Sequence, residues 1–376
     1  MDTITHGITG ALVAKSFFSE REGRMATVAI TLGAIFPDSD TFANFFITNE
    51  LARLQIHRGL THSLVALPVF AMLLGALACL WTRRQRWLRY SAFFALGIGV
   101  HILLDVITSF GTQVWTPLSN TRAAWDLTFI IDFIFTAIVL LPQLAAWVYS
   151  DRRRALLRGG LVWFGLTAAG VAVGWLANRL RIPLSFWTVA AVSLLVGILL
   201  LLPGATPAGF RWPRSFYCRI GVAALALYLG LCAIAHQAAL ARVREFARQS
   251  GAVVQRLAAL PAPPSFLSWS GLVETPEGIY RIPIDLSDTN VAVHRFFAQA
   301  ERNRYLETAA GLDDVKIFLW FARFPWVSYR QNNGLHIVEY RDIQFYSPFR
   351  NDNSPFTLRL LFDDQGRLAR PVTLGP

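Results

Sequence analysis

Long apolar runs separated by short charged gaps dominate the first 240 residues of the chain. A helix needs about 20 mostly apolar residues to cross a bilayer. Two shorter apolar stretches, 3–18 and 26–36, flank a charged turn at 19–24, and their length fits a re-entrant hairpin as well as two crossings. Six longer segments are predicted to be transmembrane helices, at roughly 64–82, 88–107, 128–149, 159–178, 184–202 and 220–240.

The pattern changes after residue 240. A polar, arginine-rich helix is predicted to continue the last span, and the proline-rich stretch 261–264 is predicted to form a linker. Beyond it, 335–346 alternates in part between apolar and polar residues, and 356–362 reads as a strand entering a turn. Segment 291–309 is predicted to be helical. These patterns favour a small soluble domain of mixed structure.

The predicted fold class is therefore mainly α: a multi-pass transmembrane helical bundle with a small C-terminal α+β soluble domain. We expect three parts along the chain. Residues 1–150 form a membrane domain that carries four of the seven histidines, and 151–240 add further transmembrane helices. Residues 241–376 form the linker and the α+β domain.

Composition and charge support a membrane protein. Hydrophobic residues make up 54% and charged residues 16% of the chain, whereas soluble domains carry about 25% charged residues. This excludes a simple soluble enzyme and a disordered chain. The formal net charge is +11, but lysine occurs only at Lys15 and Lys316, and much of the arginine lies between apolar runs. That placement indicates membrane orientation rather than a nucleic-acid partner.

The arginines also predict orientation. They concentrate in the gaps after the first, third and fifth predicted spans, at 83–89, 152–158 and 211–219, which should face the cytoplasm. The C-terminal domain would then lie outside the cytoplasm, although the arginines at 242–248 favour the opposite side. We expect no cleavable signal peptide, because the first 18 residues lack a basic stretch before the apolar one. The three cysteines lack metal-like spacing.

Four clusters of ionisable residues fall within the first 105 residues. Ionisable groups at membrane depth are costly, so a cluster of them indicates a function. The clusters are Asp2 with His6, Asp38 with Asp40, His57 and Arg58 with His62, and His101 with Asp105.

The spacing within each cluster suits metal binding. His101 and Asp105 stand four residues apart on a predicted helix, so that both project from one face about 6 Å apart. Asp38 and Asp40 follow a proline that ends a helix. His57 and His62 are five apart, which suits a loop entering a helix, with Arg58 as a fixed cation between them.

The predicted topology brings these clusters to one interface. The segment with His57 and His62 precedes the first long span, and His101 ends the second, so they lie on the same side of the membrane. A hairpin of 3–18 and 26–36 would bring its two open ends together as well. Imidazole and carboxylate ligands without thiolate favour Zn²⁺, with Mn²⁺ or Fe as alternatives, in a site of one to three ions.

Each cluster also has a purely structural interpretation. A single buried His101 can serve as a hydrogen-bonding residue between helices, and Asp38 and Asp40 can belong to a turn. The His57 segment can be an interfacial loop. Asp132 can act as a supporting partner or mark a helix end. Only the agreement among the clusters favours a metal site over these alternatives.

Four motifs in order, MDTITHGITG, GAIFPDSD, HRGLTHS and the HxxxD of GVHILLDV, resemble the membrane-bound metal-dependent hydrolase family related to bacterial YdjM proteins. The resemblance covers roughly residues 1–150. It implies a bacterial inner (cytoplasmic) membrane protein, and some members are regulated by the LexA repressor. The metal ligands that it implies are His6, Asp38, Asp40, His57, His62, His101 and Asp105, with Arg58 and Asp2 as accessories.

The HxxxD pattern is also distantly similar to zinc-dependent phospholipase C, which implies a phosphoester or lipid-like substrate and the membrane lipid as a partner. In the first hypothesis, metal-activated water attacks that substrate, Asp40 or Asp2 acts as general base and Arg58 neutralises developing charge. The alternatives are an ion or proton-coupled transporter with a His/Asp relay, and a membrane scaffold with a structural metal site. Protein partners stay open.

Overall fold

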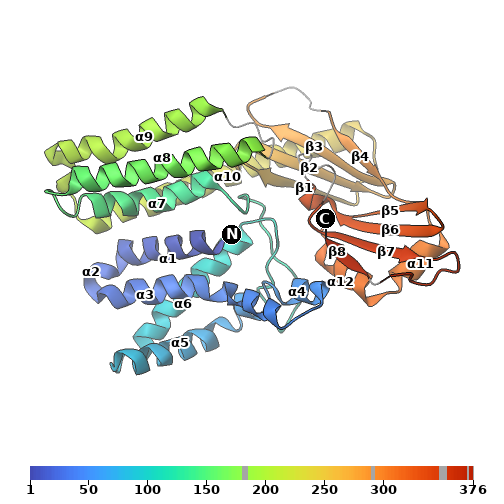
Figure 1. The fold of residues 1–376 in the computed structure, drawn as a ribbon, viewed down its shortest axis with the longest axis horizontal. Helices are drawn as coiled ribbons and strands as arrows, with labels where there is room; N and C mark the ends of the chain where they lie inside the picture. The colour runs from blue at the N-terminus through green and yellow to red at the C-terminus, as the bar shows by residue number, and fades with distance from the viewer. Residues whose placement is uncertain (180–184, 289–292, 347–353, 371, 376) are drawn as a thin grey trace. The chain divides into compact units, whose positions relative to one another are not determined.

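The computed structural model describes residues 1–179, 185–288, 293–346, 354–370 and 372–375 (Figure 1). The chain divides into two compact units, each assembled from three segments. The helical unit comprises Met1–Phe36, Leu67–Leu104 and Phe133–Tyr228. The mixed unit comprises Pro37–Ala66, Asp105–Asp132 and Leu229–Pro376.

The helical unit consists of apolar helices. Its elements are α1 (Thr3–Phe17), α2 (Ser19–Glu22), α3 (Arg24–Ile35), α5 (Leu67–Thr82), α6 (Trp87–Val106), α7 (Phe133–Val148), α8 (Ala155–Arg179), α9 (Phe186–Ala205), η3 (Pro207–Phe210) and the first part of α10 (Arg214–Gln249). The unit boundary falls inside α6, after Leu104, and inside α10, after Tyr228. The chain of α6 and the chain of α10 therefore each pass from the helical unit into the mixed unit.

Four helices among the described residues are long and apolar enough to cross a membrane. These are α6, α10, residues 155–176 of α8 and residues 186–203 of α9. The number rises to five if Glu50–His62 and Leu67–Thr82, which are bent by 70° at a short break, count as one broken span. The prediction of a multi-pass helical bundle is confirmed in this coarser form.

The predicted span at 128–149 is shorter than expected. Helix α7 begins only at Phe133 and has 16 residues, fewer than the roughly 20 that a full crossing takes. The preceding residues belong to a loop of the mixed unit, where Thr128 forms a β-bridge with Thr108 and Asp132 accepts a hydrogen bond from Ser265. Asp132 thus stands at a helix end, and apolar residues before it do not extend the helix.

Small residues allow helices of the helical unit to approach closely. Helices α1 and α3 lie side by side (Figure 1), and a Cβ atom at Gly10 would stand 2.6 Å from the Cβ of Ala34. A Cβ at Gly97 on α6 would stand 2.3 Å from the backbone oxygen of Ile30 on α3. Such contacts are a usual means of packing helices in membranes. Gly97 therefore lies at a close contact between helices, whereas a Cβ at Gly99 would meet only Leu67, at 3.9 Å.

We expect Gly97→Ala to destabilise the protein and Gly99→Ala to leave its stability nearly unchanged. The added methyl group at Gly97 meets backbone atoms, which cannot rotate away, and overpacking of this kind costs about 1–3 kcal/mol. Thermal unfolding of the detergent-purified variants measures the difference. Equal midpoints for the two variants would contradict the close approach of α3 and α6.

The mixed unit contains short helices and two antiparallel sheets. Its helical elements are α4 (Glu50–Ile56), η2 (Leu60–His62), α11 (Arg304–Ala310), α12 (Asp313–Phe321) and η4 (Ile343–Phe345), together with most of η1 (Phe36–Phe45) and the second part of α10. The first sheet has the order β1 (Arg256–Ala262), β2 (Ser268–Thr275), β3 (Gly278–Asp285) and β4 (Arg295–Ala298). The second has the order β5 (Pro325–Asn332), β6 (Leu335–Asp342), β7 (Thr357–Phe362) and β8 (Thr373–Gly375).

Local sequence explains the second sheet. Asn333 and Gly334 both adopt positive φ, at 50° and 74°, which is the two-residue turn that matches the twist of a hairpin. Residues 335–346 contain β6, and 356–362 contain β7, which pairs with β8 after a turn, so both strand predictions are confirmed. The buried side chains of this sheet pack on α11 and α12.

The first sheet differs from the predictions at two places. Pro261 lies in β1, opposite Trp269 of β2, and not in a linker. Strand β1 is at the sheet edge, where a residue without an N–H can be accommodated. Segment 291–309 is only partly helical, because its described part forms β4 and then α11, while 291–292 lie outside the described residues. The second part of α10 packs on β1–β3, so the predicted polar helix is confirmed.

Candidate metal centre

The two aspartates of the second motif lie at the start of η1. Pro37 follows α3 closely, and Asp38 and Asp40 belong to the short 3₁₀ stretch that begins there. The Asp40 carboxylate accepts a hydrogen bond of 2.8 Å from the backbone N–H of Arg58. Its other oxygen lies 3.3 Å from Nδ1 of His57. Asp40 therefore joins the second motif to the third.

The third motif forms a tight loop between α4 and α5. Arg58 adopts a left-handed conformation with φ of 57°, which is costly for a residue with a side chain and is found mostly at functional sites and turns. Ser63 accepts hydrogen bonds from the backbone N–H groups of Val65 and Ala66, at 3.0 and 3.3 Å. It caps the entry to α5, as the prediction of a loop entering a helix required.

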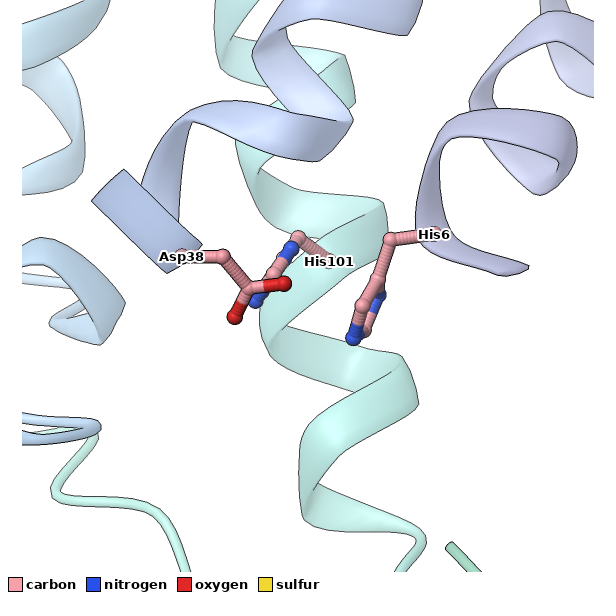
Figure 2. A group of neighbouring side chains, drawn as sticks. All are labelled: His6, Asp38 and His101. Carbon is pink, nitrogen blue, oxygen red and sulfur yellow. The ribbon is translucent and has the colours of Figure 1, made fainter. Parts of the chain in front are cut away.

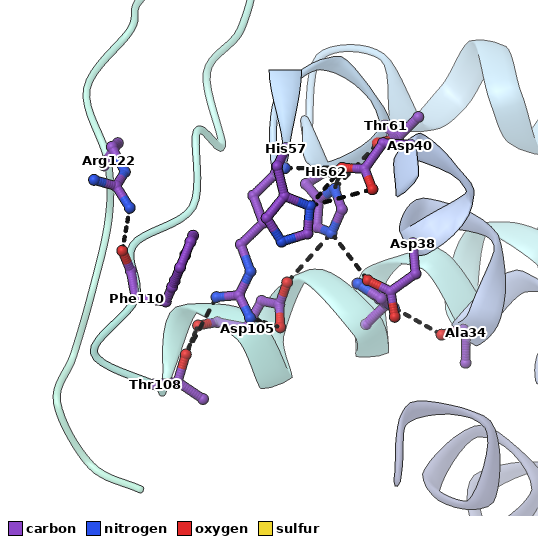
Figure 3. Close-up of polar contacts among 12 residues, drawn as sticks. Ala34, Asp38, Asp40, His57, Thr61, His62, Asp105, Thr108, Phe110 and Arg122 are labelled. Carbon is purple, nitrogen blue, oxygen red and sulfur yellow. Dashed lines mark hydrogen bonds and ion pairs between the residues drawn. The ribbon is translucent and has the colours of Figure 1, made fainter. Parts of the chain in front are cut away.

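His62 lies among three carboxylates (Figure 3). Its Nε2 is 3.3 Å from Asp105 and 3.7 Å from Asp38, and its Nδ1 is 3.6 Å from Asp40. The imidazole is fully buried. One histidine therefore joins carboxylates of the second and fourth motifs, although they are more than 60 residues apart in the chain.

Arg58 is the cation that accompanies these carboxylates. Its guanidinium forms an ion pair of 2.9 Å with Asp105 and donates a hydrogen bond of 3.3 Å to Thr108 (Figure 3). The side chains of Arg58 and Asp105 are 3% and 0% exposed. A buried ion pair keeps its charges because each group satisfies the other.

The cluster gathers three carboxylates in a small space. The side chains of Asp38, Asp40 and Asp105 are 12%, 3% and 0% exposed, and all three lie within 3.7 Å of the His62 imidazole. Carboxylates that lie close together away from water are costly unless positive charge compensates for them. Arg58 supplies a guanidinium beside Asp105, and three carboxylates at this spacing also suit a divalent cation.

The first and fourth motifs contribute two stacked imidazoles in the helical unit. The rings of His6 on α1 and His101 on α6 stack with centroids 3.6 Å apart, and both side chains are fully buried (Figure 2). Nδ1 of His101 donates a hydrogen bond of 2.7 Å to the backbone oxygen of Ala34. This contact fixes the tautomer and leaves Nε2 as the electron-pair donor, which is the usual arrangement of a metal-binding histidine.

Each unit carries its own group of ligand atoms. In the helical unit the imidazoles of His6 and His101 stack, and in the mixed unit the carboxylates of Asp38 and Asp105 both contact His62. Nitrogen and oxygen donors of these kinds are compatible with Zn²⁺ or Mn²⁺.

Asp2 and His57 occupy more peripheral positions. Asp2 caps α1, because its carboxylate accepts hydrogen bonds from the backbone N–H and the hydroxyl of Thr5, at 2.9 and 2.7 Å. Such a helix cap is a common structural role of aspartate. The side chain of His57 is 32% exposed and contacts Asp40. It lies at the solvent-accessible side of the cluster.

The structure adds contacts that the sequence motifs did not indicate. Phe110 lies under the Arg58 guanidinium, which is 4.7 Å from the ring centroid. Arg323 of the C-terminal domain forms a two-pronged ion pair with Asp126, at 2.7 and 2.9 Å. Burial alone would lower the pKa of Arg323, but its hydrogen bond and ion pair with Asp126 raise it. Because 197 residues separate Arg323 from Asp126, no local pattern reveals this pair.

Arg122 is a second arginine near Phe110. It donates hydrogen bonds to the backbone oxygens of Phe110 and Phe321. Burial lowers its pKa to about 10, despite the opposing charge of Asp342. The guanidinium therefore stays charged at neutral pH.

Comparisons with known proteins support a membrane protein. The helices and the buried His/Asp cluster define a multi-pass membrane protein with a candidate metal centre in its N-terminal part. Residues 1–180 match the YdjM inner membrane protein family, which confirms the predicted resemblance to YdjM proteins. This match and the apolar helices indicate an inner membrane protein.

A curated relative matches part of the chain. The uncharacterized protein YfhP of Bacillus subtilis (strain 168) is 29% identical over 155 residues, which are 39% of this chain and 46% of that protein. The alignment thus spans about half the length of the relative. No solved structure matches the chain.

Proposed function

We propose that this protein is a metal-dependent hydrolase of the inner membrane, and that it acts on a phosphoester of a lipid or lipid-like molecule. The proposal is carried by one observation: the carboxylates of Asp38, Asp40 and Asp105 gather around the buried imidazole of His62, beside the buried guanidinium of Arg58. A cluster that served packing alone would gain little from three buried carboxylates.

The donor set fits a divalent cation. Asp38, His62 and Asp105 of the mixed unit would hold it, with Asp40 and His57 as further ligands in a site of two or three ions. The sequence motifs add His6 and His101 to this proposed ligand set. Imidazole and carboxylate donors without thiolate favour Zn²⁺, with Mn²⁺ or Fe as alternatives. When bound, the cation supplies Lewis-acid activation of water and of a phosphoryl oxygen.

The remaining residues have distinct roles in the proposed reaction. Arg58 presents a fixed guanidinium that binds a phosphoryl oxygen and stabilises the charge that develops on it. Asp40 accepts the proton of the attacking water, and the partly exposed His57 lies beside it to pass that proton on to solvent. Asp2 is the weaker candidate for the base, because both its oxygens already accept hydrogen bonds from Thr5.

A relay for ions or protons is a less favoured function. A relay needs ionisable groups along the depth of several spans. Helix α9 contains none in its sequence, and α8 contains only Arg158 and Arg179, close to its two ends. The clustered acids and histidines therefore favour one reaction centre over a pathway.

The orientation of the chain belongs to the same proposal. The arginines at 83–89, 152–158 and 211–219 would face the cytoplasm, so that the C-terminal domain lies outside it. Attaching a membrane-impermeant reagent to a single cysteine introduced at exposed Ser287 in intact cells tests this placement. Labelling only after cell lysis would contradict it.

A metal-reconstituted assay tests the hydrolase. Detergent-purified protein loaded with Zn²⁺ or Mn²⁺ is offered a panel of phospholipids and generic phosphodiesters, and the released products are quantified. We expect turnover by the wild type, a loss of at least about 100-fold in His57→Ala and full activity in His294→Ala. His294 is an exposed histidine of the C-terminal domain and serves as the matched control. Equal rates in all three proteins would count against the site.

A further inference from the structure

Beyond the metal ligands, the C-terminal domain contacts the loop that carries Phe110. We propose that Arg323, together with Gln344, is a positioning residue that holds Phe110 and thereby the Arg58 guanidinium in place for a phosphoryl group. The inference rests on the proposed function and deepens it. It gives residues outside the matched region 1–180 a role in the site.

The first step concerns the hydrogen bonds that fix the backbone of Ser109. The backbone oxygen of Ser109 accepts hydrogen bonds from Nη1 of Arg323 at 3.0 Å and from Nε2 of Gln344 at 2.7 Å. Both donors come from the C-terminal domain, and both converge on the residue next to Phe110. A hydrogen bond from a charged donor is stronger than one between neutral groups.

The second step is the rigidity of Arg323 itself. The two-pronged pair with Asp126 fixes the plane of the guanidinium. Asp342 accepts hydrogen bonds from the backbone N–H groups of Arg323 and Phe324, each at 3.1 Å, and from that of Gln344 at 3.0 Å. One buried carboxylate therefore orders both segments that reach Ser109.

The third step is the aromatic packing around Phe110. Its ring packs on Phe321, Phe345 and Phe356 of the C-terminal domain, with centroids 5.6, 5.9 and 6.2 Å away. It also meets the ring of His57 at 5.6 Å. The Phe110 side chain thus lies in contact with both the C-terminal domain and the metal-site cluster.

The last step is the effect on Arg58. The guanidinium lies over the Phe110 ring and is fixed at its sides by Asp105 and Thr108. An attractive contact with an aromatic face stabilises a cation. Groups that bind a substrate must be held close to the productive geometry. A shift of the Phe110 loop would therefore weaken the binding of a phosphoryl group by the Arg58 guanidinium without removing any metal ligand.

The test compares Arg323→Ala and Arg323→Lys with Arg367→Ala in the full-length protein. Arg367 is an arginine of the same domain whose side chain is 72% exposed, and it serves as the matched control. Hydrogen–deuterium exchange of the metal-free proteins is followed over residues 56–63 and 107–113. Binding of inorganic phosphate to the metal-loaded proteins is measured by calorimetry.

We expect Arg323→Ala to speed exchange in both segments and to weaken phosphate binding about tenfold, with bound metal unchanged. Arg323→Lys should be intermediate, and Arg367→Ala should behave as wild type. Gln344→Leu removes a single hydrogen bond to Ser109 and should give a smaller change in the same direction. If Arg323→Ala does not fold, the Gln344→Leu variant tests whether the C-terminal domain positions Phe110 and Arg58.

Two results would overturn the inference. Unchanged exchange over 56–63 in the variants would show that the C-terminal domain does not hold Arg58. Faster exchange with unchanged phosphate affinity would show a structural contact alone. A wild type that takes up no metal would instead refute the proposed function, and exchange would still decide whether Arg323 positions Arg58.

Discussion

Replacing His101 with alanine should remove most of the bound metal from the purified protein. His101 is one of the ligands that the sequence motifs imply, and its Nδ1 hydrogen bond to Ala34 makes Nε2 the electron-pair donor of the ring. Loss of one imidazole from a site of three or four donors should lower the metal affinity by at least about 100-fold. Mutating a residue that only hydrogen-bonds to a metal ligand already lowers metal affinity about 10–100-fold. Elemental analysis after dialysis against a weak chelator measures the retained metal.

The same measurement needs two comparisons. His294→Ala removes an exposed histidine and should retain the wild-type metal content. His101→Gln keeps much of the side-chain volume in this fully buried position, so it separates loss of a ligand from loss of folding. Equally little metal in wild type and His101→Ala would remove the basis for a metal centre.

Replacing Asp105 with asparagine should strongly destabilise the metal-free protein. The substitution leaves the buried Arg58 guanidinium without its ion-pair partner at 2.9 Å. Removal of one member of a buried pair costs about 3–5 kcal/mol, because the other charge stays buried and uncompensated. Thermal and chemical unfolding in detergent, with a chelator present, measure the loss.

A double-mutant cycle provides the control for this prediction. Arg58→Met removes the charge and keeps much of the stem, so that the double variant with Asp105→Asn contains neither charge. We expect the double variant to be more stable than Asp105→Asn alone, because the stability changes caused by substituting two residues in contact do not add. Additive losses would show that the pair at 2.9 Å does not stabilise the fold.

The helical part of the fold was largely predictable because apolar length is a local property. Segments of about 20 apolar residues have few alternatives to a membrane helix, and 88–107 corresponds to α6. The prediction was wrong at 128–149, where five residues before Phe133 join a loop. Hydropathy does not register the β-bridge of Thr128 or the hydrogen bond from Ser265 to Asp132.

The C-terminal domain was less predictable. Alternation identified β6 and β7, and the turn residues Asn333 and Gly334 account for the hairpin before them. Pro261 was misinterpreted as a linker residue, because only its edge position in β1 makes a proline acceptable there. Whether a strand lies at the edge or in the centre of a sheet depends on the strand order, and the strand order depends on pairings between segments that are distant in the sequence.

By itself, the sequence determined the class of protein and the chemical types of the candidate ligands. Apolar runs dictate membrane helices, and imidazoles and carboxylates in ordered motifs predict a metal centre because charge at membrane depth is costly. The tertiary structure alone decided which groups touch: that His62 lies among three carboxylates, that Asp2 caps a helix, and that Arg323 reaches Ser109. The physical reason is that local propensity acts over a few residues, whereas ion pairs and ring contacts depend on how distant segments pack.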